Sequence, residues 1–121
     1  MLRFTDRHEW LRLDGEVAVV GITRRAAQEA GRFISAELPK LGTLLKKGDR
    51  AALLTSALTA LDSRAPADGE VIEVNTDVIA DPSRINADPR GEGWLYRLRV
   101  DDARSLEGLM DEQAYRQFVA A

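Results

Sequence analysis

Few side chains in this 121-residue sequence have the type and spacing that catalysis requires. His8 is the only histidine, and it stands beside Glu9 and Trp10, a grouping that could move a proton. No nucleophile or metal-binding partner accompanies it, so we interpret His8 as a structural residue at the start of a sheet. The acidic residues show no close pairing that would specify acid–base work or a metal cluster. The sequence therefore predicts no catalytic residue, no metal ligand and a protein that is not an enzyme.

Other reactive groups are equally scarce. The chain has no cysteine, which excludes disulfides, thiolate catalysis and cysteine-bound metal together. Its only lysines are Lys40, Lys46 and Lys47, and we expect all three on solvated turns. Gly91 and Gly93 mark a corner before a strand and lack the following helix that a phosphate-binding loop needs.

Composition places the chain among ordinary globular domains, with 45% hydrophobic and 31% charged residues. We expect one domain over residues 1–121. The net charge is −3 and the two signs are interspersed, so we expect no nucleic acid partner. No apolar run approaches the roughly 20 residues of a membrane span, so we expect no membrane partner. The first six residues lack a signal-peptide core, which predicts the cytoplasm.

The elements that would position a site are organised around residues 53–71. This stretch reads as a strand, a short turn near Leu58, a returning strand, and a second turn at residues 67–69. Asp68-Gly69 between apolar runs is a strong turn signal, because glycine tolerates positive φ and aspartate bonds to nearby backbone. The sequence therefore predicts a β-hairpin with its tip at Leu58.

The rest of the chain reads as short strands with few helices. Asp14-Gly15 separates two apolar runs and predicts a hairpin. Thr23 and Gly31 have the types expected at the start and stop of a helix. The expected strands cover residues 4–13, 16–22, 33–38, 70–75 and 94–100, and the expected helices 23–30, 82–85 and 111–119. Trp10 and Trp94 are expected in the core.

The stretch over residues 53–71 resembles the modification hairpin of the glycine cleavage system H-protein family, a branch of the lipoyl domains. That family reads Glu-Ser-Val-Lys-Ala and then Ala-Pro-x-x-Gly-Glu-Val, and residues 55–59 and 65–71 occupy the two parts. Further motifs that agree in order and spacing are His8-Glu9-Trp10, Val20-Gly21-Ile22-Thr23, residues 41–50, 86–89 and 91–95. The resemblance extends from Phe4 to about Val119, with a modest departure at Arg32, where the family commonly carries an acidic residue.

The resemblance implies a mostly β fold, a flattened barrel-sandwich hybrid of the lipoyl-domain type with short peripheral α-helices, including a C-terminal one. It also implies a carrier whose lipoyl group, held by an amide on the hairpin lysine, passes an aminomethyl group between enzymes. Here the family's lipoyl-lysine falls on Leu58, which has no nucleophilic atom. The family's hairpin Glu, which helps the modifying enzyme recognise the site, falls on Thr55.

Two interpretations of the function remain. The first is an H-protein homologue without a lipoyl group, and so with no cofactor, in a docking or regulatory role. The second is a working lipoyl carrier in glycine decarboxylation, modified at another lysine or derived from an active parent. The resemblance suggests a monomer whose partners are glycine cleavage proteins or lipoyl-modifying enzymes. We also hypothesise an apolar contact patch at Leu58 with Leu54, Ala57 and Leu61, against the simpler interpretation of core residues plus one exposed leucine.

Overall fold

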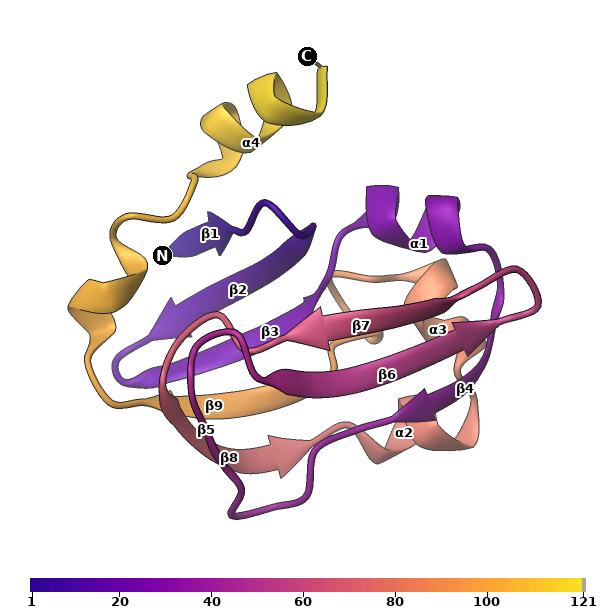
Figure 1. Ribbon diagram of the computed structural model, residues 1–121, viewed down its shortest axis with the longest axis horizontal. Coiled ribbons are helices and arrows are strands. Elements are labelled where there is room, and N and C mark those ends of the chain that lie inside the picture. The colour runs from indigo at the N-terminus through magenta and orange to yellow at the C-terminus, as the bar shows by residue number, and fades with distance from the viewer. Residues whose placement is uncertain (121) are drawn as a thin grey trace.

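The computed structural model describes residues 1–120, which form two antiparallel sheets and several short helices (Figure 1). The strands are β1 (Leu2–Phe4), β2 (Glu9–Asp14), β3 (Val17–Ile22), β4 (Phe33–Glu37), β5 (Leu44–Leu45), β6 (Arg50–Ser56), β7 (Ala60–Arg64), β8 (Gly69–Val74) and β9 (Tyr96–Val100). The helices are α1 (Arg24–Ala30), α2 (Thr76–Ala80), α3 (Ser83–Ala87), the 3-10 turn η1 (Ala103–Leu106) and α4 (Glu112–Ala120). No helix in this range is long and apolar enough to cross a membrane.

The two sheets enclose the main core between them. The larger sheet has the order β1-β2-β3-β9-β8-β5 and the smaller has the order β4-β6-β7, which lies in front of β3 and β9 in Figure 1. Val20 of β3, Leu98 of β9 and Leu54 of β6 are fully buried in one cluster. The predicted mostly β fold with short helices is confirmed, although the sheets do not close into a barrel within the described residues.

The turns that shape the sheets follow the sequence signals. β2 and β3 form the predicted hairpin, with Asp14 opposite Val17. β7 ends at Arg64 and the chain bends over residues 66–68, close to the predicted turn, but Gly69 itself starts β8 and does not have the positive φ that the turn signal assumed. A Cβ at Gly69 would lie 2.4 Å from the Arg99 carbonyl oxygen, so glycine lets β8 approach β9 closely there.

The first predicted strand is broken into two. β1 and β2 pair antiparallel, with Phe4 opposite Trp10, and a tight turn separates them. The Thr5 hydroxyl accepts hydrogen bonds from the Arg7 and Glu9 backbone N–H groups at 3.3 and 3.1 Å. His8 closes the turn with a φ of +66°. Local side-chain bonding therefore overrides the weak alternation that suggested one continuous strand.

Helix α1 begins and ends as predicted, since the Thr23 hydroxyl accepts from Ala26 N at 3.2 Å and Gly31 follows the last turn. Helix α2 was not predicted. Asn75, expected to close a strand, accepts from the Asp77 N–H at 3.1 Å and so starts this helix.

The C-terminal helix packs on a second, smaller core. Asp111 caps α4, accepting from Ala114 N at 2.8 Å. The Tyr115 ring stacks on Phe4 with a centroid distance of 4.5 Å. Phe118, further along the same helix, is 43% exposed.

The two tryptophans differ in burial. Trp10 is fully buried, and its indole N–H donates to the Pro89 carbonyl at 2.9 Å. Trp94 is only half-buried, with the Arg97 guanidinium 4.9 Å above its ring. The core prediction is therefore confirmed for Trp10 and only partly met by Trp94.

Candidate functional site

The hairpin of β6 and β7 projects its tip away from the sheets toward the C-terminal end of α1 (Figure 1). Thr55 pairs with Ala60 as the last partners of the ladder, and the Ser56 N–H donates to the Thr59 carbonyl at 2.8 Å. Leu58 stands at the tip with 80% of its side chain exposed. The structure thus places the predicted tip residue where a partner could reach it.

Ser56 fixes the conformation of the tip. Its buried hydroxyl donates to the Ala30 carbonyl at 2.6 Å. The same oxygen accepts from the Leu58 and Thr59 N–H groups, each at 3.1 Å. One hydroxyl therefore folds the turn and fastens it to the last turn of α1. The motif that contains Ser56 does not reveal this role, because Ala30 is 26 residues away in the sequence.

Gly31 provides the surface on which the tip rests. Its φ of +86° favours glycine, and a Cβ there would lie 3.3 Å from the Leu58 Cδ1 atom. Leu58 therefore leans over the end of α1 without being buried by it.

Thr55 is half-buried on β6, opposite Ser35 of β4 on one side and Ala60 of β7 on the other. The apolar patch hypothesised around Leu58 is wrong for Leu54, and Leu61 is only partly exposed. Leu54 is fully buried in the core, because alternation along β6 turns it to the opposite face from Thr55, and Leu61 packs partly against the same core.

The lysines lie away from the tip. Lys46 and Lys47 occupy the turn before β6, and this seven-residue strand separates that turn from the tip by about 20 Å. The Lys46 ammonium is 3.7 Å from an Asp68 carboxylate oxygen, and Lys40 is exposed in the turn before β5.

His8 belongs to a contact between the β1–β2 turn and α4. Its Nδ1 atom is 2.7 Å from the Tyr115 hydroxyl, and that hydroxyl donates to the Thr23 hydroxyl at 3.0 Å. Burial is the main cause that raises the pKa of Tyr115 above its ordinary value. The three side chains join β2, α1 and α4 into a structural link.

Glu9 carries a buried carboxyl group that links the two sheets, a role that the sequence alone did not reveal. It starts β2 of the larger sheet, yet it accepts hydrogen bonds from the Arg64 N–H at 2.7 Å and the Ser63 hydroxyl at 3.3 Å on β7 of the smaller sheet. The Thr5 hydroxyl donates to it at 2.8 Å. Burial raises the pKa of Glu9 above its ordinary value despite these bonds. The Glu9 carboxylate therefore links the larger sheet to the smaller one by hydrogen bonds.

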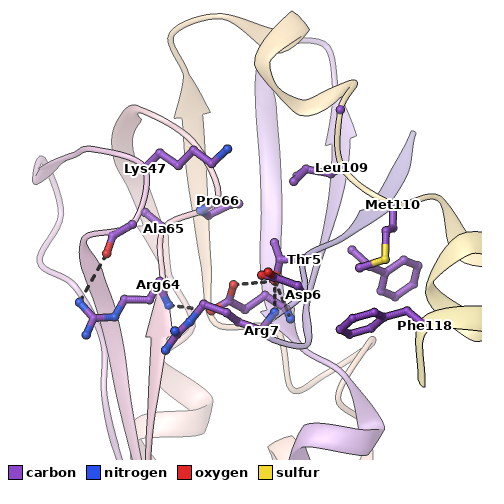
Figure 2. Close-up of a pocket in the computed structure, with 14 residues that line it drawn as sticks. Thr5, Asp6, Arg7, Lys47, Arg64, Ala65, Pro66, Leu109, Met110 and Phe118 are labelled. Carbon is purple, nitrogen blue, oxygen red and sulfur yellow. Dashed lines mark hydrogen bonds between the residues drawn. The ribbon is translucent and has the colours of Figure 1, made fainter. Parts of the chain in front are cut away.

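A pocket of about 690 Å³ opens beside Glu9 (Figure 2). Figure 2 shows Lys47 and Pro66 on one wall and Met110 and Phe118 on the opposite wall. Its lining is mainly apolar and also includes the charged side chains of Asp6, Arg7, Glu9, Lys47 and Arg64. In residues 1–120, no group of three or more His, Cys, Asp or Glu side chains is arranged to hold a metal ion.

Comparison with known proteins supports the architecture and defines the family. The structure is similar to that of a glycine cleavage system H protein from Mycobacterium marinum, with a TM-score of 0.90 and 30% sequence identity over 99% of this chain and 97% of that one. The predicted lipoyl-domain-like fold is thereby confirmed. The model of the "Glycine cleavage H-protein" family matches residues 2–121, which is nearly the whole sequence. This chain therefore belongs to the glycine cleavage H-protein family.

Proposed function

We propose that this protein is an H-protein homologue that carries no lipoyl group and acts as a docking or regulatory partner of H-protein-binding enzymes. The observation that carries the proposal is Leu58. It stands exposed at the hairpin tip, and the resemblance of residues 55–71 to the family motif places the lipoyl-lysine at this position. An amide to a lipoyl group requires an amine, and a leucine side chain has no nitrogen.

The rest of the tip supports a role in recognition. Ser56 and Gly31 hold the turn in one conformation, so the exposed residue is presented in a defined position. Thr55 lies three residues before Leu58, where the family's recognition Glu stands, and its side chain is neutral. An intact scaffold with an apolar tip favours a protein contact over a covalent cofactor.

The alternative, a working carrier modified elsewhere, has weaker support. Lys46 and Lys47 are separated from the tip by the length of β6, and Lys40 lies in a different turn. A lipoyl arm on any of them would start from another end of the molecule. We accordingly propose no catalytic residue and no resident cofactor, a monomeric single domain, and enzymes of the glycine cleavage system or lipoyl-modifying enzymes as the partners.

The intact mass of the protein purified from its own cells tests the proposal directly. We expect the mass of the unmodified chain, and peptide mapping should find Lys40, Lys46 and Lys47 free. A mass increased by one lipoyl group would overturn the proposal, and the mapped lysine would identify the carrier position.

A gain-of-function variant tests whether position 58 is the lost attachment site. With an active lipoyl ligase, Thr55→Glu combined with Leu58→Lys should become lipoylated, because the tip conformation does not depend on the side chain at 58. Leu44 is 77% exposed on β5 and gives a matched control, Thr55→Glu with Leu44→Lys, which should stay unmodified. If both variants stay unmodified, the site has diverged beyond these two residues.

A further inference from the structure

The fold gathers arginines that the sequence scatters. Two surface hollows flank Arg24 at the start of α1. One, of about 460 Å³, is lined by Arg24, Arg25, Arg90 and Arg116, and the other, of about 490 Å³, by Arg24 and Arg32. All five side chains are exposed. We name these five residues the arginine face.

The carboxylates near this face do not balance its charge. Glu112 is shared by two arginines, at 3.2 Å from Arg90 and 3.5 Å from Arg116. Glu29 pairs with Arg25 at 2.9 Å. Three arginines therefore form ion pairs with only two carboxylates. This local excess of positive charge contrasts with the net charge of −3 of the whole protein.

The second hollow contains two arginines, and its other lining residues are uncharged. Arg24 and Arg32 make no ion pair within residues 1–120, and no acidic side chain lines this hollow. Asp88, the other acid of the first hollow, already accepts from the Glu92 N–H at 3.1 Å. Guanidinium groups are thus available at the surface for carboxylates of another molecule.

The stability of α1 does not explain Arg24. Arg24 and Arg25 occupy its first turn, which has no acidic residue. The N-terminal end of a helix carries partial positive charge, so cations there are unfavourable. Arg25 pairs with Glu29 one turn later and donates to the Val119 carbonyl at 3.3 Å, whereas Arg24 makes no ion pair within residues 1–120. Arg24 therefore indicates a contribution outside the helix.

The arginine face adjoins the hairpin tip. Gly31, on which Leu58 leans, lines the second hollow together with Arg32. A molecule that covers the tip would therefore meet the nearest arginines in the same contact.

We propose that the arginine face binds a carboxylate-rich surface of a protein partner, beside the hairpin tip. This inference rests on the proposed docking function, because it places that partner's acidic residues. Planar guanidinium groups pair with carboxylates through two parallel hydrogen bonds, which gives orientation as well as attraction. The interspersed Glu29 and Glu112 would repel a continuous phosphate backbone, whereas a protein surface can offer its own basic residues to them.

An NMR titration at low salt with a glutamate-rich peptide that also carries interspersed lysines tests the assignment. We expect shift changes concentrated in residues 23–32, 83–90 and 112–116. Arg24→Glu with Arg32→Glu should weaken peptide binding about tenfold, since two exposed attractions become repulsions. The matched control, Lys46→Glu with Lys47→Glu, makes the same change in net charge at the other end of β6 and should leave binding nearly unchanged.

Three outcomes would overturn the inference. Equal weakening by both double variants would mean that only overall charge matters. Shift changes centred on the lysine turn would place the acidic contact elsewhere. Tighter binding of a single-stranded oligonucleotide than of the peptide would assign the face to nucleic acid. None of these results depends on whether the protein is lipoylated, so the proposed function and this inference can fail separately.

Discussion

Replacing Ser56 with alanine should loosen the hairpin tip at a cost that the hydrogen bonds predict. The variant removes the hydrogen bond from Ser56 to the Ala30 carbonyl. Ala30 is only 3% exposed, so its carbonyl oxygen would be left buried without that donor. An unsatisfied buried acceptor costs about 1–3 kcal/mol. The Leu58 and Thr59 N–H groups lie at an exposed turn and can bond to water instead, so they add little. We therefore expect a loss of about 2 kcal/mol in the free energy of unfolding.

Urea denaturation measures this loss. For a domain of this size, about 2 kcal/mol lowers the midpoint by about 1 M. Ser35→Ala is a matched control, because Ser35 is an exposed serine on the neighbouring strand β4 and should change stability by less than about 0.5 kcal/mol. Amide hydrogen exchange at residues 58 and 59 should also accelerate in the Ser56 variant.

Two results would refute this reasoning. If Ser56→Ala and Ser35→Ala unfold at the same urea concentration, the hydroxyl does not fasten the hairpin to α1. If the Ser56 variant is destabilised but exchange at residues 58 and 59 is unchanged, the loss arises in the core and not at the tip.

Four further predictions concern other parts of the molecule. Gly69→Ala should lower the free energy of unfolding by roughly 1–3 kcal/mol in urea titrations, because its Cβ would meet the Arg99 backbone; an unchanged midpoint would contradict that close approach. The folded-state pKa of Glu9 is raised, so ionisation of Glu9 opposes folding. The free energy of unfolding of the wild type, relative to that of Glu9→Gln, should therefore fall as pH rises above about 4.5. A wild type that gains stability over Glu9→Gln with rising pH would contradict this. Leu58→Ser should weaken capture of a glycine cleavage enzyme while leaving the free energy of unfolding within about 0.5 kcal/mol of the wild type, and unchanged capture would reject the contact at the tip. Arg24→Glu should stabilise the protein by about 0.3–1 kcal/mol by complementing the α1 dipole, which thermal unfolding can measure, and a lower melting temperature would contradict this.

Local signals were sufficient to predict most of the fold. Asp14-Gly15 marked a real turn and Thr23 marked the start of α1, because each acts on residues within a few positions of itself, whereas Asp68-Gly69 marked the end of a bend and the start of β8. Helix α2 was missed because Thr76, Val78 and Ile79 are β-branched and favour a strand in isolation, whereas the Asn75 cap starts a helix.

The site was predicted less completely than the fold. The exposure of Leu58 followed from the hairpin pattern, since a turn tip faces solvent. The bond from Ser56 to Ala30 and the bond between Glu9 and Arg64 join residues 26 and 55 positions apart, and no local pattern encodes such pairs. For Leu54 the simpler interpretation as a core residue holds and the patch hypothesis does not, because strand alternation turns its side chain into the core.

At the hairpin tip, the residue that would bear a cofactor is not one of the residues that determine the shape of the turn. Ser56 and Gly31 determine the backbone there, while Leu58 contributes little buried surface. Selection for a folded, stable chain therefore acts strongly on the first two positions and hardly at all on the third. A lineage can exchange the side chain at 58, and with it the chemistry, without crossing an unfolded intermediate. The same independence makes this hairpin a permissive place to graft a new reactive group.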